Sequence, residues 1–117
     1  MNEALQNLKD KIIDDFERFQ NNGRNWEGRG EHQARRLQEF IEGLHFEEGR
    51  KYIKVIKALG AQQVVWGFVV KGENDKKFRK GDILKAAGWA APARNAARGN
   101  VLDGDFSWVR WTGPEYL

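Results

Sequence analysis

YIKVIKALGAQQVVWGFVV, residues 52–70, is the stretch that decides the fold. Residues 52–57 and 64–70 are rich in β-branched and aromatic side chains, a composition typical of β-strands. The second run is apolar on both faces, which predicts a central strand with neighbours or helices on each side. Trp66 lies in the middle of this run, and we expect its indole to be part of the core.

Two helices are predicted before these strands. Over residues 2–20 apolar side chains recur at every third or fourth position, the pattern of an amphipathic helix; they are Leu5, Leu8, Ile12, Phe16 and Phe19. A second helix is expected over 31–43, and the glycine-rich residues 23–30 join the two. Residues 1–48 are therefore predicted to form a helical hairpin.

Residues 49–117 are expected to form a β-rich, basic part. Residues 72–75 predict a turn, residues 78–85 a short strand, and residues 106–111 a last strand. Pro92 and Gly99 stand where helices begin and end, so the intervening residues predict a short C-terminal helix.

The predicted fold class is α+β, with an N-terminal helical hairpin followed by a small, mostly antiparallel β-sheet with a short C-terminal helix. The length of 117 residues fits a single domain, 1–117. The mean hydropathy of −0.75 together with five tryptophans leaves little apolar material for one core. We therefore expect a homo-oligomer joined through the helices of residues 1–48.

The composition argues against several classes of function. The chain has no cysteine, Ser107 is the only serine and Thr112 the only threonine, and there are two histidines. Nucleophilic triads and histidine-rich metal sites have almost no residues to use. We expect no catalysis, no metal and no cofactor. Without an 18-residue apolar run or the features of a signal peptide, we expect a cytoplasmic protein with no membrane partner.

The charge of the chain is uneven. Residues 51–100 hold 11 Lys and Arg against 3 Asp and Glu, although the whole chain has a net charge of only +3. Such a segment raises the local concentration of nucleotides, nucleic acids or acidic proteins. It is here that we expect an anion to bind.

Arg94 and Arg98 are the central candidates, because a helix over 92–99 would place them on one face. In one interpretation they bind acidic residues nearby in the sequence, which are Asp82, Asp103 and Asp105. In the other they form a fork for phosphate or carboxylate, and Asn95 adds amide hydrogen bonds. Both interpretations stay open at this point.

Aromatic residues near these arginines suggest a nucleotide. Trp89 precedes Pro92, while Trp108 and Arg110 would alternate onto one face of the last strand. A tryptophan can stack on a base while a neighbouring arginine binds phosphate. Trp26, in the loop of glycines and arginines, suits a ligand lid or an oligomer contact better than a core.

A denser basic cluster surrounds the turn after the second strand. Its members are Lys71, Lys76, Lys77, Arg79 and Lys80. The cluster is either a solvated turn or a patch that follows the phosphates of a nucleic acid, whose binding would weaken steeply with salt.

The segment GDILKAAGW at 81–89, followed by Pro92-Ala93-Arg94 and Arg98-Gly99-Asn100, resembles small bacteriophage proteins, most of them uncharacterised. In those proteins a β-hairpin precedes a KAA-x-W-x-x-PA segment and a basic turn. The resemblance covers roughly residues 51–117. A weaker likeness links the helical hairpin and compact β part to Thoeris anti-defence sponges, which are oligomers that bind nucleotide-derived immune signals without chemistry. It transfers no binding residue.

We therefore expect a non-enzymatic, phage-type protein that sequesters a small phosphorylated ligand, such as a nucleotide immune signal, in the host cytoplasm. Arg94 and Arg98 would hold phosphate, and Trp89 or Trp108 would stack on the base. An alternative is a nucleic-acid-binding accessory protein that uses the basic cluster. A third hypothesis is an inhibitor of a host enzyme, acting through the acidic first helix or the apolar face of the hairpin.

Overall fold

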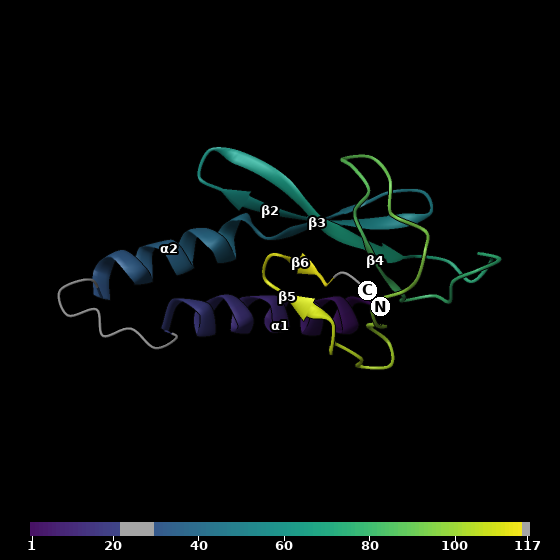
Figure 1. Cartoon of the computed structure of the whole chain (residues 1–117), viewed down its shortest axis with the longest axis horizontal. Coiled ribbons are helices and arrows are strands. Elements are labelled where there is room, and N and C mark those ends of the chain that lie inside the picture. The colour runs from purple at the N-terminus through teal and green to yellow at the C-terminus, as the bar shows by residue number, and fades with distance from the viewer. Residues whose placement is uncertain (22–29, 116–117) are drawn as a thin grey trace.

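The computed structural model describes residues 1–21 and 30–115 (Figure 1). Within these ranges the elements, in chain order, are α1 (Asn2–Asn21), α2 (Gly30–Gly43), β1 (His45–Glu48), β2 (Tyr52–Leu59), β3 (Gln62–Val70), β4 (Ile83–Lys85), β5 (Val109–Arg110) and β6 (Gly113–Pro114). The molecule is elongated, with principal extents of 52 × 26 × 26 Å.

β2 and β3 form the centre of a four-stranded antiparallel sheet of order β1-β2-β3-β4. Their pairing runs from Leu59 opposite Gln62 at the turn to Tyr52 opposite Val70 at the far end. β3 is buried over its last five residues, from Trp66 onwards. The prediction of a central, apolar strand at 64–70 is therefore confirmed.

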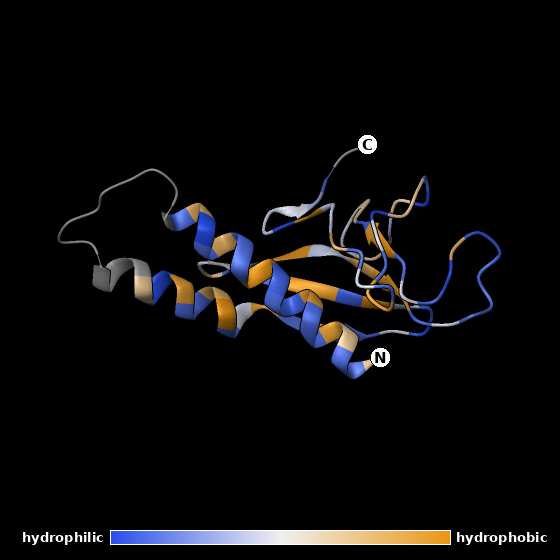
Figure 2. Ribbon diagram, turned by 90° about the horizontal axis from the view of Figure 1, so that it is seen from below, coloured by the Kyte–Doolittle hydropathy of each residue, from blue (hydrophilic) through white to orange (hydrophobic). Residues whose placement is uncertain are grey.

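α1 packs its apolar stripe against one face of this sheet. Leu8 and Ile12 are fully buried and belong to the same core cluster as Val55 of β2 and Val69 of β3. Figure 2 shows that the side of α1 turned away from the strands is largely hydrophilic. Neither helix in the described ranges is both long and apolar enough to cross a membrane.

Loops cover the opposite face of the sheet. Phe68 and Val70 of β3 and Leu84 of β4 form a second buried cluster with Phe78, which comes from the loop between these strands. Ala97 packs on the edge of this cluster. β3 is therefore buried on both sides although helices cover only one of them.

The predicted fold class is wrong, mainly in the C-terminal half. Residues 92–99 do not form a helix. The strand expected over 106–111 is reduced to β5, which pairs with β6 in a separate two-stranded sheet. The strand expected over 78–85 is reduced to β4. In addition, β1 lies within residues 1–48, which we predicted as a helical hairpin, and it pairs with β2.

Residues 92–100 run beside β4 because the edge of that strand offers them backbone hydrogen bonds. The amide of Ala93 donates to the carbonyl of Lys85 (2.7 Å), and the amide of Arg98 donates to the carbonyl of Ile83 (2.7 Å). A helix of two turns is too short to be stable without packing. Pairing with β4 also covers a sheet edge that would otherwise expose unpaired backbone groups.

Side chains from the central sheet hold the backbone of the C-terminal β5–β6 hairpin. The hydrogen bonds run from Trp66 Nε1 to the carbonyl of Arg110 (2.7 Å), from Lys57 Nζ to those of Trp111 (3.2 Å) and Thr112 (3.0 Å), and from Lys85 Nζ to that of Pro114 (2.8 Å). The ammonium of Lys57 also lies 5.1 Å from the centre of the Trp111 ring. Cationic side chains of β2 and β4 thus hold the C-terminal hairpin against the central sheet.

Lys57 makes the stability of the protein depend on pH. Burial lowers the pKa of Lys57, and the nearby charge of Lys85 lowers it further. Between this lowered pKa and the ordinary value of 10.5, the unfolded chain binds more protons than the folded chain. The free energy of unfolding should therefore rise with pH across this window.

We expect Lys57→Met to flatten this rise, because methionine carries no titrating group. Urea unfolding at about pH 7 and at about pH 10, just below the ordinary value, gives the two free energies to compare. Lys54→Met, on the same strand, is the control and should keep the pH dependence of the unmodified protein. The same rise in Lys57→Met as in the unmodified protein would contradict the assignment.

Candidate anion-binding site

A cavity of about 630 Å³ opens beside the turn between β1 and β2. Its lining comes from that turn and the start of β2, the end of β3 and the loop after it, and the segment beside β4. The lining residues are Arg50, Lys51, Tyr52, Val70, Gly72, Asn74, Asp75, Lys76 and Arg94. Four cations and one carboxylate therefore face a space of the size that small ligands occupy.

The register of β2 and β3 brings these segments together. Tyr52 begins β2 and pairs with Val70, the last residue of β3. Because the two strands are antiparallel, the β1–β2 turn and the loop after β3 lie at the same end of the sheet. The ammonium of Lys71 donates to the carbonyl of Gly49 (3.1 Å), which ties the loop to the turn.

Arg94 already has an acidic partner inside the cavity. Its guanidinium donates to both carboxylate oxygens of Asp75, at 2.9 Å each, and to the hydroxyl of Tyr52. It also lies 4.9 Å from the centre of the Phe78 ring. A bidentate pair of this kind fixes both side chains.

Asp75 is occupied as an acceptor. One of its oxygens also accepts the backbone amides of Lys77 (2.8 Å) and Phe78 (2.9 Å). The hydrogen bonds from Arg94 and then those two amides hold the pKa of Asp75 well below its usual range. The hydrogen bond with Asp75 in turn raises the pKa of Arg94. Asp75 therefore stays ionised and is poorly suited to deliver or accept a proton.

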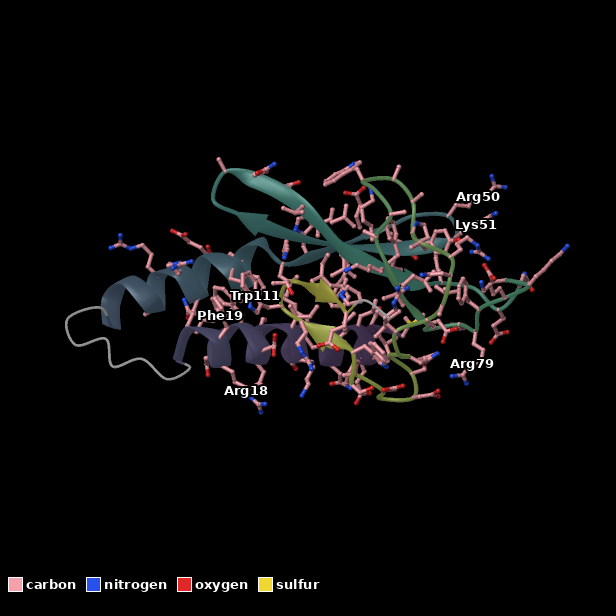
Figure 3. All side chains as sticks on the ribbon, viewed as in Figure 1. Arg18, Phe19, Arg50, Lys51, Arg79 and Trp111 are labelled. Carbon is pink, nitrogen blue, oxygen red and sulfur yellow. The ribbon has the colours of Figure 1, made fainter. Side chains whose placement is uncertain are left out.

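The remaining cations of the cavity are Arg50, Lys51 and Lys76. Arg50 and Lys51 are exposed, and Figure 3 shows both at the end of the molecule that carries the β1–β2 turn. Within residues 1–21 and 30–115, no carboxylate lies within ion-pair distance of Arg50, Lys51 or Lys76. These three side chains are available to an anion.

The structure does not join Arg94 and Arg98 into a fork. Arg98 is buried, with 2% of its surface exposed, and does not line the cavity. It donates to Asn95 Oδ1 (2.8 Å) and to the carbonyls of Ala96 (2.7 Å) and Glu115 (3.2 Å). Asn95 uses the same oxygen to accept the amide of Ala96. Arg98 and Asn95 therefore hold the chain itself together.

The predicted aromatic residues lie apart from Arg94. Trp89 is 51% exposed, and the ammonium of Lys54 lies 4.5 Å from the centre of its ring. Trp108 is half-buried in the turn before β5, while Arg110 forms an ion pair with Glu115 (2.9 Å). Neither Trp89 nor Trp108 lines the cavity. Trp26 lies outside the described residues.

The members of the basic cluster after β3 lie in different surroundings. Lys71 pairs with Glu48 (2.8 Å) and Arg79 with Asp103 (2.6 Å), while Lys77 donates to the carbonyl of Arg94 (2.6 Å). Lys76 lines the cavity beside the β1–β2 turn, whereas Lys71 and Lys80 line a different cavity beside the start of α1. Figure 3 shows Arg79 on the other side of this loop from Arg50 and Lys51. The five cations do not form one continuous track.

The model of a family of unknown function, DUF7717, matches residues 1–114. The chain belongs to this family. No curated protein and no solved structure matches the chain. Among the described residues of this family member, no group of three or more His, Cys, Asp or Glu could hold a metal ion.

In this member of the family, residues 81–100 form a structural network beside the cavity. Asn100 is buried and donates to Asp82 Oδ1 (2.9 Å) and to the carbonyl of Lys80 (3.0 Å). Its own Oδ1 accepts the amides of Leu102 (2.8 Å) and Asp103 (3.0 Å). The other carboxylate oxygen of Asp82 accepts the amide of Arg79 (2.8 Å). The turn at Asn100 is thus held from both sides.

Sequence reasoning missed Arg50, Lys51 and Tyr52. A signal was present, because an antiparallel hairpin of residues 52–57 and 64–70 places the residues before Tyr52 next to the basic loop after Val70. Arg50 and Lys51 directly precede the first of these strands. The expected hairpin, combined with the positive charge of its two flanking segments, would have indicated this end of the sheet as the place for an anion.

Proposed function

We propose that the protein binds a small phosphorylated ligand, such as a nucleotide, in the cavity beside the β1–β2 turn, and that it holds the ligand without converting it. The observation that carries this proposal is a set of three cations, Arg50, Lys51 and Lys76, which line one cavity of about 630 Å³ and form no ion pair with a carboxylate of the described residues. Phosphate oxygens would accept hydrogen bonds from these side chains.

Two features support binding rather than chemistry. The carboxylate of Asp75 is fully engaged by Arg94 and two backbone amides. Tyr52 offers an aromatic ring on the cavity wall, and its hydroxyl accepts a hydrogen bond from Arg94. The cavity is thus equipped to position an anion.

The resemblance of residues 51–117 to small bacteriophage proteins, together with the weaker likeness to Thoeris anti-defence sponges, suggests the biological setting. In that setting the ligand is a nucleotide-derived immune signal in the cytoplasm of the host. Sequestering the signal requires tight binding but no turnover, and this agrees with the binding without conversion that we propose for the cavity.

A polymeric nucleic acid is a weaker candidate than a small ligand. Lys71 and Arg79 are neutralised by Glu48 and Asp103, which interrupts the charge a polymer would follow. A polymer binder loses orders of magnitude in affinity between low and moderate salt. A ligand held by a few cations in a cavity should lose much less.

The test combines native mass spectrometry with charge reversal. Protein purified from cells should carry a bound mass of nucleotide size, and Arg50→Glu/Lys51→Glu should lose it. Lys9→Glu/Lys11→Glu, an equal charge change on α1, is the matched control and should keep it. Titration of the stripped protein with ATP as probe should show affinity at least about tenfold weaker in the cavity variant.

Two results would refute the proposal. One is that the cavity variant keeps the same bound mass, or the same affinity for ATP, as the α1 control. The other is binding of single-stranded DNA that far exceeds binding of ATP and collapses with salt, which would establish the nucleic-acid hypothesis instead.

A further inference from the structure

The apolar stripe of α1 continues past the part of the helix that the sheet covers. Ile12 and Phe16 are buried, but Phe19, the next residue on the same stripe, is 58% exposed. Figure 1 shows why, because the end of α1 and the start of α2 project beyond the sheet. Phe19 therefore adds exposed apolar surface to the stripe whose other members are buried.

A cavity of about 450 Å³ lies beside this surface. Phe16 and Phe40 stack there with centroids 4.2 Å apart, and Trp111 meets them edge-on at 5.1 and 6.1 Å. The ring centroids of Phe19 and Trp111 lie 5.0 Å apart. Figure 3 shows the two side chains near each other. The backbone amide of Trp111 donates to Asp15 on α1 (2.8 Å), which fixes the indole between the helices.

The charged lining of this cavity can complement a copy of itself. Arg36, Glu39 and Glu42 lie along one helix, α2, and each is exposed. In a two-fold dimer, a contact of one residue with another is repeated in reverse. Antiparallel packing of two α2 helices would place Arg36 of each copy near Glu42 of the other. The surface therefore fits a second copy of this chain better than a partner of one charge.

We propose that a second copy of the chain covers this surface in a two-fold dimer. Phe19 of each copy packs against the aromatic cavity of the other, with Arg36 facing Glu42 at the edges. Figure 3 places Phe19 and Trp111 toward one end of the molecule and Arg50 and Lys51 at the opposite end. The dimer consequently leaves both anion cavities open.

Sedimentation equilibrium measures the mass directly. The protein should have a mass of twice 13.5 kDa, and Phe19→Asp should have a mass of 13.5 kDa. Leu102→Asp is the matched control, because Leu102 is also a large exposed apolar residue (48%) but lies outside this surface. It should remain a dimer. Far-UV circular dichroism checks that each variant is folded.

A charge exchange provides a second, independent measurement. Arg36→Glu should weaken the dimer, and Arg36→Glu/Glu42→Arg should restore it, because the pair is re-formed with its signs reversed. A mass of 13.5 kDa for the unmodified protein at about 100 μM overturns the proposal. So does a dimer that Phe19→Asp leaves intact, or a double variant as weak as Arg36→Glu alone.

Discussion

Gly99→Ala is expected to lower the free energy of unfolding by about 4 kcal/mol, because two separate costs add at this position. Gly99 has a φ of +128°, a conformation that side chains with a Cβ rarely adopt. A Cβ at this position would also press into the backbone carbonyl oxygen of Asp105. That carbonyl accepts the amide of Asn100 (3.1 Å), so the backbone cannot move aside without breaking the turn.

Gly104→Ala separates these two costs. Gly104 also has a positive φ, of +70°, but a Cβ there would meet no atom within 4 Å. We expect this variant to lose about 1 kcal/mol, from backbone strain alone. Urea unfolding of both variants gives the comparison. Equal losses would show that contact with Asp105 is unimportant and that the turn at 99–105 adapts freely.

The periodic parts of the fold could be predicted because their signals are local. A stripe at every third or fourth position made α1 recognisable, and the apolar run around Trp66 made β3 recognisable as a central strand. The segment at 92–99 failed because the decisive interaction is not local. Proline and glycine at its ends are as compatible with an extended segment as with a helix, and only β4 selects between them.

The lining of the candidate cavity could be read from the sequence only in part, for the same reason. Arg94 does line the cavity, but the spacing of four that linked it to Arg98 has meaning only on a helix. In an extended segment the two side chains have unrelated surroundings. Asp75, the partner of Arg94, lies 19 residues earlier, and no sequence pattern connects the two. Arg50 and Lys51 become part of the site only through the register of β2 and β3.

The second large effect is expected at Arg98, because this arginine is buried whereas Arg94 is exposed. Arg98→Ala is expected to lower the free energy of unfolding by about 3 kcal/mol. Its side chain is almost fully buried and makes hydrogen bonds to Asn95, Ala96 and Glu115. Removing the side chain leaves a void. It also leaves three acceptors without their donor, so the cost of desolvating these acceptors is no longer offset. The bond to Glu115 also anchors the end of the chain, so the C-terminal hairpin should loosen first.

Arg94→Ala is the natural comparison, since both arginines belong to one short stretch but only Arg98 is buried. We expect Arg94→Ala to cost much less stability, because the Arg94 side chain is 42% exposed and solvent and salt therefore screen its pair with Asp75. In contrast, it should strongly weaken ATP binding, because the carboxylate of Asp75 would then lie in the cavity without Arg94 and would repel the phosphates. Urea unfolding and ATP titration of the two variants separate these roles. If Arg94→Ala proved the more destabilising, the ion pair with Asp75 rather than the buried Arg98 would be the main support of this region, and the assignment of roles would have to be reversed.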